Sequence, residues 1–354
     1  GGGGVNRNVI INGAMNVAQR GTSSTGLGAD GTSYNTVDRF QFTASGTAGR
    51  FTQTQDSSAP SGFSKSLKFD CTTADTSIAA GELLILSQLI EGQNVQHFAK
   101  GTSDAKPFAV SFYVKGNASA TYVAELYDGD NNRCVSKTFS VTTDWTRIEL
   151  SMGADTTGAF DNDNAVSLYL NIWLHGGSNY TGGTLNTSWN AVTQANRAVG
   201  ISSFFDSTDR TFFLTGVQVE AGQNPTEFEH EPYAVTYEKA RRYYQQTSSN
   251  VQSTGFVYDT HPMCTYRFPV TMRAAPTVAL ISGAYADGNS SDNSGFSQKT
   301  GHGAIAYSSP TGASFNTGTE YFRFFYSGGS FNVAPSEYGQ GLMANIAASI
   351  DAEL

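Results

Sequence analysis

The chain has 354 residues, a formal net charge of −9 at pH 7, 14% charged and 12% aromatic residues, and 38 glycines. This length fits two domains, and few charges with many aromatics and glycines are typical of short strands joined by turns rather than of a disordered chain. The acidic balance excludes nucleic acid as a partner, because phosphate binding needs a basic surface, and no apolar run is long enough to predict membrane insertion.

The N-terminal segment, residues 1–34, begins with Gly1–Gly4, which we predict to be a flexible joint. It continues with the run NVIINGAMNVAQRGT at residues 8–22. This run is similar to NLIINGAMxVAQRGTS, with which bacteriophage tail-fibre and related virion proteins often open. By that resemblance, residues 1–34 are an anchoring segment that joins other virion proteins. Asn12 and Arg20 are candidate contacts there, but we favour a role as buried polar residues that fix the loop.

Residues 35–232 are predicted to form a β-sandwich, because runs rich in β-branched and aromatic residues recur at the spacing of such a fold. These runs cover residues 39–43, 50–53, 66–69, 83–89, 109–114, 122–127, 135–141, 147–151, 167–174 and 211–220. The stretches FAVSFYVKG (108–116) and DWTR (144–147) are similar to strands of jelly-roll carbohydrate-binding modules. This resemblance implies a jelly-roll β-sandwich and leaves sugar binding open.

The best candidate for recognition is the loop WLHGGSNYTGGTLNTSW, residues 173–189. Sugars bind through aromatic faces flanked by hydrogen-bonding side chains. The predicted ligand-binding residues are therefore Trp189, Tyr180, His175 and Asn179. The alternative, which we favour for both tryptophans, is that Trp189 plugs the end of the sandwich and Trp173 belongs to its core. In the resembling proteins, a tryptophan often falls near the position of Trp189.

The segment TGVQVEAGQNPTEFEHEPYAVTYEKARRYYQQ, residues 215–246, predicts a strand, a loop and a short helix that begins near Pro232. Its parts resemble TGVQLE-x-G, PFEHRPY and CQRYY of the same phage proteins. Glu231 stands where a basic residue is usual, and Ala240 where a cysteine is usual. The connecting helix, residues 233–247, is too short to be stable alone in water, so its apolar stripe needs a partner. That stripe consists of Tyr233, Tyr237, Ala240 and Tyr244.

Residues 248–354 are predicted to form a second, smaller β-sandwich domain after a polar linker at 247–253. Its expected strands cover residues 256–258, 264–268, 278–281, 303–307, 321–326 and 344–350. The run FPVTMRAAP at 268–276 is similar to a strand and turn in C-terminal domains of the same phage proteins. The domain offers a second possible recognition surface through its own aromatic residues Tyr285, Tyr307 and Tyr338.

The sequence predicts neither an enzyme nor a metal or cofactor site. The motifs G-x-S-x-G, H-E-x-x-H and G-x-x-x-x-G-K-[ST] are absent, and the five histidines stand singly. His230 is expected to satisfy backbone groups of its loop. The three cysteines are odd in number and scattered, so we expect buried free thiols at Cys71, Cys134 and Cys264 rather than disulfides.

Three groups of acidic residues are close enough in sequence to be considered for glycoside cleavage. They are Asp128/Asp130, Asp161/Asp163 and Glu227/Glu229/Glu231. All are expected in solvated loops with ordinary pKa values. Asp128, Asp130 and Asn132 also match the first three ligand positions of a calcium loop, but Arg133 and Phe139 stand where glycine and an acid are required. A hairpin turn is favoured, and a structural calcium stays open.

By resemblance, the chain is a phage virion fibre protein, made in the bacterial cytoplasm and located on the particle. It is expected to be a non-enzymatic homotrimer that attaches to host surface polysaccharide through many weak contacts. Two alternatives stay open. One is a structural fibre or capsid decoration protein without a ligand, which a fully packed Trp189 loop favours. The other is a polysaccharide-degrading enzyme, which a carboxylate pair facing a cleft favours.

Overall fold

The structure is a computed structural model that describes residues 7–247, 252–258, 261–284, 296–298, 313–326 and 341–354. The chain divides into two compact units, one of Gly1–Tyr237 with Leu354 and the other of Glu238–Glu353. Both units are built almost entirely of antiparallel strands, which confirms the all-β prediction. Among the described residues, no helix is long and apolar enough to cross a membrane.

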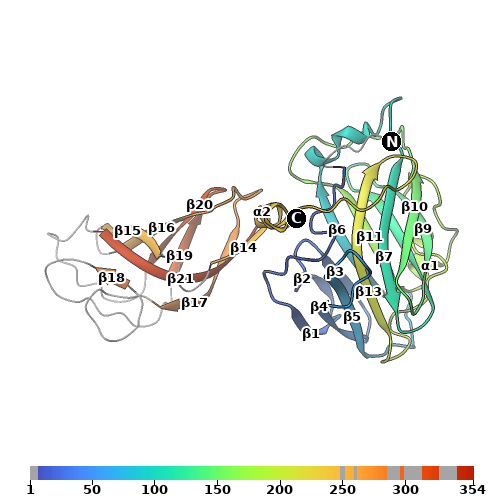
Figure 1. Ribbon diagram of the computed structural model, residues 1–354, viewed down its shortest axis with the longest axis horizontal. Helices are drawn as coiled ribbons and strands as arrows, with labels where there is room; N and C mark the ends of the chain where they lie inside the picture. Colours follow the sequence, from blue (N-terminus) through green and yellow to red (C-terminus); the bar gives the residue numbers. More distant parts are fainter. Residues whose placement is uncertain (1–6, 248–251, 259–260, 285–295, 299–312, 327–340) are drawn as a thin grey trace. The chain divides into compact units, whose positions relative to one another are not determined.

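The first unit is a jelly-roll β-sandwich of two sheets, whose long strands run alongside one another in Figure 1. The six-stranded sheet has the order β1 (Ser23–Leu27), β4 (Arg50–Asp56), β5 (Ser66–Thr73), β13 (Thr211–Ala221), β7 (Phe108–Gly116) and β10 (Thr146–Gly153). The seven-stranded sheet has the order β12 (Asn190–Ala191), β9 (Arg133–Val141), β8 (Ala120–Asp128), β11 (Val166–Gly176), β6 (Leu83–Glu91), β3 (Gln41–Ser45) and β2 (Gly31–Tyr34).

One hydrophobic core fills the space between the two sheets. Successive side chains of a strand point to opposite faces, so β11 places Leu168, Leu170 and Ile172 in this core. The residues between them, Tyr169 and Asn171, lie on the outer face of the seven-stranded sheet. The fold therefore presents two outer surfaces on which a site can be built.

All ten strands predicted for this unit are present, within a few residues of their expected bounds. Three further strands, β1, β2 and β12, lie at sheet edges and were not predicted. Their sequences, SSTGL, GTSY and NA, are polar and mostly exposed, so they carry no apolar alternation. Pairing with β4, β3 and β9 makes them strands.

The predicted domain boundary at residue 35 does not match the structure, because the preceding residues belong to the sandwich. The amide of Val9 donates to the carbonyl of Val219 over 3.0 Å, and that of Val217 donates to the carbonyl of Gly13 over 3.0 Å. Asn12 is buried, as expected for a polar residue that fixes the loop, and its amide group donates to the carbonyls of Val17 and Asp38.

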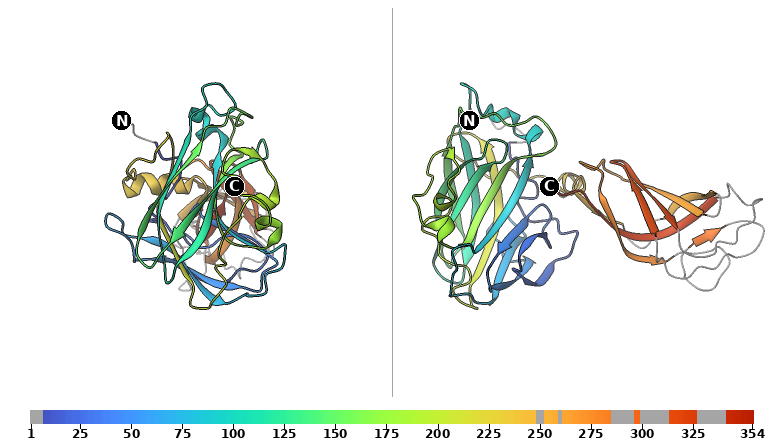
Figure 2. Two further views of the ribbon diagram at one scale, coloured as in Figure 1. Left: turned by 90° about the vertical axis from the view of Figure 1, so that its right-hand side faces the viewer. Right: turned by 180° about the vertical axis from the view of Figure 1, so that it is seen from behind.

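Helix α2 (Tyr233–Arg241), seen from the side in Figure 2 (left), is shorter than the predicted 233–247. Tyr233 is 58% exposed and stacks on Tyr237, with ring centroids 5.8 Å apart, while Ala240 is buried. The prediction that Tyr244 shares their helical face is wrong. Tyr244 lies in strand β14 (Tyr244–Gln246), which pairs with the last strand of the second unit.

The described strands of the second unit form one eight-stranded sheet. They are β14, β15 (Gln252–Tyr258), β16 (His261–Arg267), β17 (Thr277–Ala284), β18 (Phe296–Gln298), β19 (Ala313–Thr317), β20 (Tyr321–Tyr326) and β21 (Gly341–Asp351). Thr247 is buried and exchanges two hydrogen bonds with Ala348, so it belongs to this sheet and not to a linker. The predicted strand at 303–307, and Tyr285, Tyr307 and Tyr338, lie outside the described residues.

Candidate functional site

The outer face of the seven-stranded sheet carries a row of hydrogen-bonded polar side chains. Ser87, Asn171 and Glu125 come from the neighbouring strands β6, β11 and β8, and the sheet register places them opposite one another. The Ser87 hydroxyl donates to the Asn171 side-chain oxygen over 2.7 Å, and the Asn171 amide group donates to Glu125 Oε2 over 2.8 Å. The indole N–H of Trp173 donates to the same oxygen over 3.2 Å. This buried row fixes the side chains on that face of the sheet.

Arg197 completes the row from a loop above the sheet. Its Nε and one terminal nitrogen donate to the two carboxylate oxygens of Glu125, at 2.8 and 2.7 Å. The guanidinium also lies over the rings of Trp173 and Tyr127, 5.0 and 5.2 Å from their centroids. Burial lowers the pKa of Arg197, but the hydrogen bonds and charge of Glu125 outweigh this and raise it above its ordinary value. The Arg197 charge is thus matched by the Glu125 carboxylate.

Residues 177–210, which connect β11 to β13, fold back over this face, and we call this segment the excursion. It contains helix α1 (Ser178–Thr181) and a 3₁₀ turn at Gln194–Asn196. Gly177 allows the close approach at its start, because a Cβ there would lie 2.0 Å from the carbonyl oxygen of Ala79. Beneath the excursion, a small second core packs Ile85, Val123, Trp173 and Ala198.

A groove of about 770 Å³ lies where the excursion meets the sheet. Its polar lining residues are Ser178, Asn179, Thr193, Gln194 and Arg197. Its aromatic and apolar lining consists of Tyr180, Trp173, Leu83, Ile85 and Ala195. The Tyr180 ring is half-buried and lies 5.2 Å from that of Trp173. A few hydrogen-bonding groups around apolar surface are typical of a ligand site.

The structure divides the four predicted ligand-binding residues into two pairs. Asn179 and Tyr180 line the groove, whereas His175 and Trp189 do not. His175 is completely buried; its Nε2 donates to Glu82 over 3.1 Å, and its Nδ1 lies 2.8 Å from the Ser203 hydroxyl. Burial lowers the pKa of His175 despite the nearby carboxylates of Glu82 and Asp75. This histidine stabilises the interior and is not available to a ligand.

Trp189 belongs to the main core and is only 8% exposed. Its ring packs 5.4 Å from that of Phe108, and its indole N–H donates to the carbonyl of Gly153 over 3.3 Å. The favoured structural role of Trp189 therefore matches its position. Sequence reasoning missed Ser178, which lies within the predicted loop, and Thr193, Gln194 and Arg197, which follow it.

Buried charges near Trp189 were also not predicted. Lys100 is completely buried and contacts Asp128 Oδ2 at 2.5 Å and Asp155 Oδ2 at 3.2 Å. It also donates to the carbonyls of Thr157 and Gly158. The expectation that Asp128 is solvated is wrong, because its side chain has no exposed surface. Burial raises the pKa of Asp155, but hydrogen bonds from Arg133 and the Thr157 amide, with the Lys100 charge, hold it below its ordinary value.

Asp128 also begins the predicted hairpin turn between β8 and β9. Its carboxylate accepts hydrogen bonds from Lys100 and Asn131, and its neighbour Asp130 accepts one from the amide of Asp161. In the part of the chain that the structure describes, no group of three His, Cys, Asp or Glu side chains is placed to hold a metal ion.

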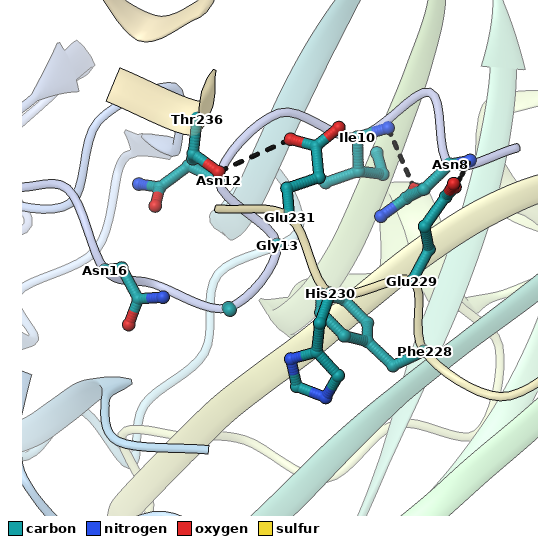
Figure 3. A pocket seen from close by; sticks show the side chains of 11 residues that line it. Asn8, Ile10, Asn12, Gly13, Asn16, Phe228, Glu229, His230, Glu231 and Thr236 are labelled. Atoms are coloured by element: carbon teal, nitrogen blue, oxygen red, sulfur yellow. Dashed lines mark hydrogen bonds between the residues drawn. The ribbon is translucent and has the colours of Figure 1, made fainter. Parts of the chain in front are cut away.

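A second, much smaller pocket of about 30 Å³ lies where residues 8–16 meet residues 228–231 (Figure 3). Glu229 accepts hydrogen bonds there from the amides of Arg7 and Asn8, and Glu231 accepts one from the Thr236 hydroxyl. The volume is about that of one water molecule. The pocket therefore lies between two segments that are distant in the sequence and hydrogen-bonded to each other, and it is too small for a sugar.

No protein-family model and no curated protein matches the chain. Among solved structures, it is similar to one titled "CBM4 structure and function", with 10% identity, a TM-score of 0.29, and coverage of 59% of this chain and 97% of that one. A family 11 carbohydrate-binding module from Clostridium thermocellum has 11% identity, a TM-score of 0.28 and coverage of 59% and 98%. The enzymatically active domain of tailspike protein 4 from bacteriophage CBA120 has 12% identity, a TM-score of 0.28 and coverage of 61% and 21%.

Proposed function

We propose that this chain is a non-enzymatic phage fibre subunit that binds glycans of the host cell surface. The observation that carries this proposal is the groove over the seven-stranded sheet, in which Tyr180 and Asn179 lie beside Arg197 and Gln194. A sugar ring has apolar C–H faces and a polar rim. The half-buried Tyr180 ring offers a surface for the former, and the amides and hydroxyls offer partners for the latter.

The virion context rests on the two sequence segments that resemble phage tail-fibre proteins, residues 8–22 and 215–246. The support is that these segments lie together although some two hundred residues separate them. Asn8 accepts a hydrogen bond from the Val219 amide and donates one to the Val217 carbonyl. Its own amide donates to Glu229. The two segments are thus held together by hydrogen bonds. The proposal includes attachment to other virion proteins near the N-terminus.

The non-enzymatic part of the proposal is supported by the buried carboxylates, which are paired with basic side chains. A glycoside hydrolase needs a carboxyl group of raised pKa as its proton donor. Here Glu125 is held by Arg197 and Asp128 by Lys100, and the pKa of Asp155 is lowered. Incubation with host surface polysaccharide should release no reducing ends. Sustained release that is lost on mutating one acidic pair would overturn this part.

The homotrimer implied by the resemblance is also part of the proposal. Tyr233 and Val235 on α2 are exposed apolar side chains, 58% and 41% accessible, of the kind that a subunit interface covers. Light scattering of the purified chain should give three times the subunit mass, and Tyr233→Glu should reduce it. A mass of one subunit at micromolar concentration would contradict self-assembly, and a trimer that survives the change would place the interface elsewhere.

One observation favours the second candidate function, a structural fibre or capsid decoration protein without a ligand. Trp189 is packed in the core, so one of the four residues predicted to bind a ligand is not accessible. The two functions differ in whether the groove binds anything.

The experiment that separates them measures binding of the full chain to host cells and to polysaccharide extracted from those cells. Tyr180→Ala should weaken binding about three- to tenfold, the loss expected for one stacking contact, without changing the thermal transition. The matched control is Trp145→Ala, because Trp145 packs on Phe213 of the other sheet. Absence of binding by the native chain would favour the structural protein, and equal binding by both variants and the native chain would place the ligand outside the groove.

A further inference from the structure

The outer face of the seven-stranded sheet holds a second pair of aromatic rings beyond the groove. Tyr127 of β8 and Tyr169 of β11 are opposite one another in the sheet register. Their ring centroids are 5.2 Å apart with an interplanar angle of 51°, and both side chains are half-buried. The Tyr127 hydroxyl donates to the side-chain oxygen of Asn132 in the turn between β8 and β9. The pair thus offers apolar ring surface with polar groups beside it.

Arg197 connects this pair to the groove. Its guanidinium lies over the Tyr127 ring and over the Trp173 ring, and the same residue lines the groove. Trp173 and Tyr169 are four residues apart on one strand without an intervening bulge, so their Cα atoms are separated by roughly 13 Å. That distance exceeds the length of a single sugar ring. The Tyr180 ring packs beside that of Trp173, with ring centroids 5.2 Å apart, so a ligand that contacts both Tyr180 and Tyr169 is expected to be a chain of several sugars.

The charges along this path point to the chemistry of such a chain. Arg197 is the one charged residue among those that line the groove, and it is already paired with Glu125. At the other end, the exposed Asp130 follows Gly129, where an added Cβ would lie 3.0 Å from a ring carbon of Tyr169. Burial, then Tyr127, then the negative charge of Asp130 raise the pKa of Tyr169. An acidic sugar would meet no available cation among these residues and would approach a carboxylate.

We propose that Tyr127 and Tyr169 form a second subsite, continuous with the groove, and that the ligand is an extended, uncharged glycan. This inference rests on the proposed function, because it assumes that the groove binds sugar. To the proposed function it adds that the ligand is several sugars long and carries no charge.

The test uses affinity electrophoresis of the full chain in gels that contain one polysaccharide each. The neutral probes are mixed-linkage β-glucan, β-1,4-galactan, xylan, mannan and dextran, and the acidic probes are polygalacturonate and hyaluronan. At least one neutral probe should retard the native chain, and that retardation should not change with salt. Retardation by acidic probes alone would contradict the proposal that the ligand is uncharged. Retardation by none of the seven probes would contradict both this inference and the proposed function on which it rests.

With the neutral probe that binds, the variants distinguish the two subsites. Tyr180→Ala and Tyr169→Ala should each weaken binding about three- to tenfold, and Tyr169→Phe, which keeps the ring, should bind like the native chain. Fragments of that probe one sugar long should bind the native chain and Tyr169→Ala equally. If Tyr180→Ala weakens binding and Tyr169→Ala does not, the second subsite is wrong while the groove stands. Thermal transitions of all variants should match that of the native chain.

Discussion

The Nζ atom of Lys100 lies 2.5 Å from Oδ2 of Asp128, and neither side chain has exposed surface. Lysine and aspartate are seldom buried this completely, and here the ammonium is surrounded by two carboxylates and two carbonyls. Removing one partner of a buried pair leaves the other charge without compensation, which is far more costly than losing an exposed pair.

Lys100→Met should therefore destabilise the first unit by about 3–5 kcal/mol. Lys68→Met is the matched control, because the Lys68–Asp70 pair is partly exposed and its loss should cost at most about 1 kcal/mol. All three tryptophans lie in the first unit, so tryptophan fluorescence during urea unfolding reports on that unit alone. Equal losses in the two variants would contradict the importance of the buried network.

The buried His175 predicts a pH dependence of stability. Because burial lowers its pKa, the unfolded chain takes up a proton that the folded chain does not once the pH falls below about 6.5. Its contribution to stability is therefore fully present above that pH and is lost as the pH falls towards the folded-state pKa. Urea unfolding followed by tryptophan fluorescence should show a smaller loss of stability between pH 6.5 and 5 in His175→Gln than in the native chain.

Some of that dependence should remain in the variant, because burial and Lys106 also lower the pKa of His97. The control is His230→Gln, since His230 is an exposed residue. The account of His175 fails if its variant and the native chain lose stability equally over this range.

Cys71 and Cys134 should be unreactive in the folded protein. Both are buried free thiols, as predicted, and burial raises the pKa of each to about 11. The thiolate is the reactive form, so at pH 8 neither Cys71 nor Cys134 should react with an aromatic disulfide reagent until the first unit unfolds. The Cys264→Ser variant isolates their signal, and the same protein in denaturant provides the full amplitude. Rapid reaction under native conditions would show that these thiols are accessible.

The joint between the N-terminal segment and β13 should depend on the lack of a side chain at Gly13. A Cβ there would lie 2.1 Å from the carbonyl oxygen of Val217, and relieving that clash requires a shift of backbone. Gly13→Ala should destabilise the first unit by about 1–3 kcal/mol, the usual cost of overpacking. Gly222→Ala is the control, because its nearest neighbour would be 3.6 Å away. Similar stability of the two variants would mean that the segment can move aside without loss.

Much of the sandwich could be predicted from the sequence, because a strand with one face in the core alternates its side chains. In β11, Leu168, Leu170 and Ile172 give this signal directly. The edge strands β1 and β2 give none, since none of their residues is fully buried. They are set by pairing with β4 and β3, which is a tertiary property.

The groove could be predicted only in part. Tyr180 and Asn179 stand out as an aromatic and an amide in a glycine-rich loop, and they do line it. The pairing of Arg197 with Glu125 joins residues 72 positions apart, and that of Lys100 with Asp128 joins residues 28 apart. No local pattern marks such pairs. For the same reason, the sequence could not show that His175 faces inwards while Asn179 and Tyr180 line the groove.

The most direct test of the central claim is hydrogen–deuterium exchange of the full chain with and without polysaccharide extracted from cells to which it binds. The proposed function predicts slower exchange in peptides that cover residues 178–181 and 193–197, which line the groove, and no change in β10 of the other sheet. Protection confined to the second unit, or no protection at saturating polysaccharide, would contradict it.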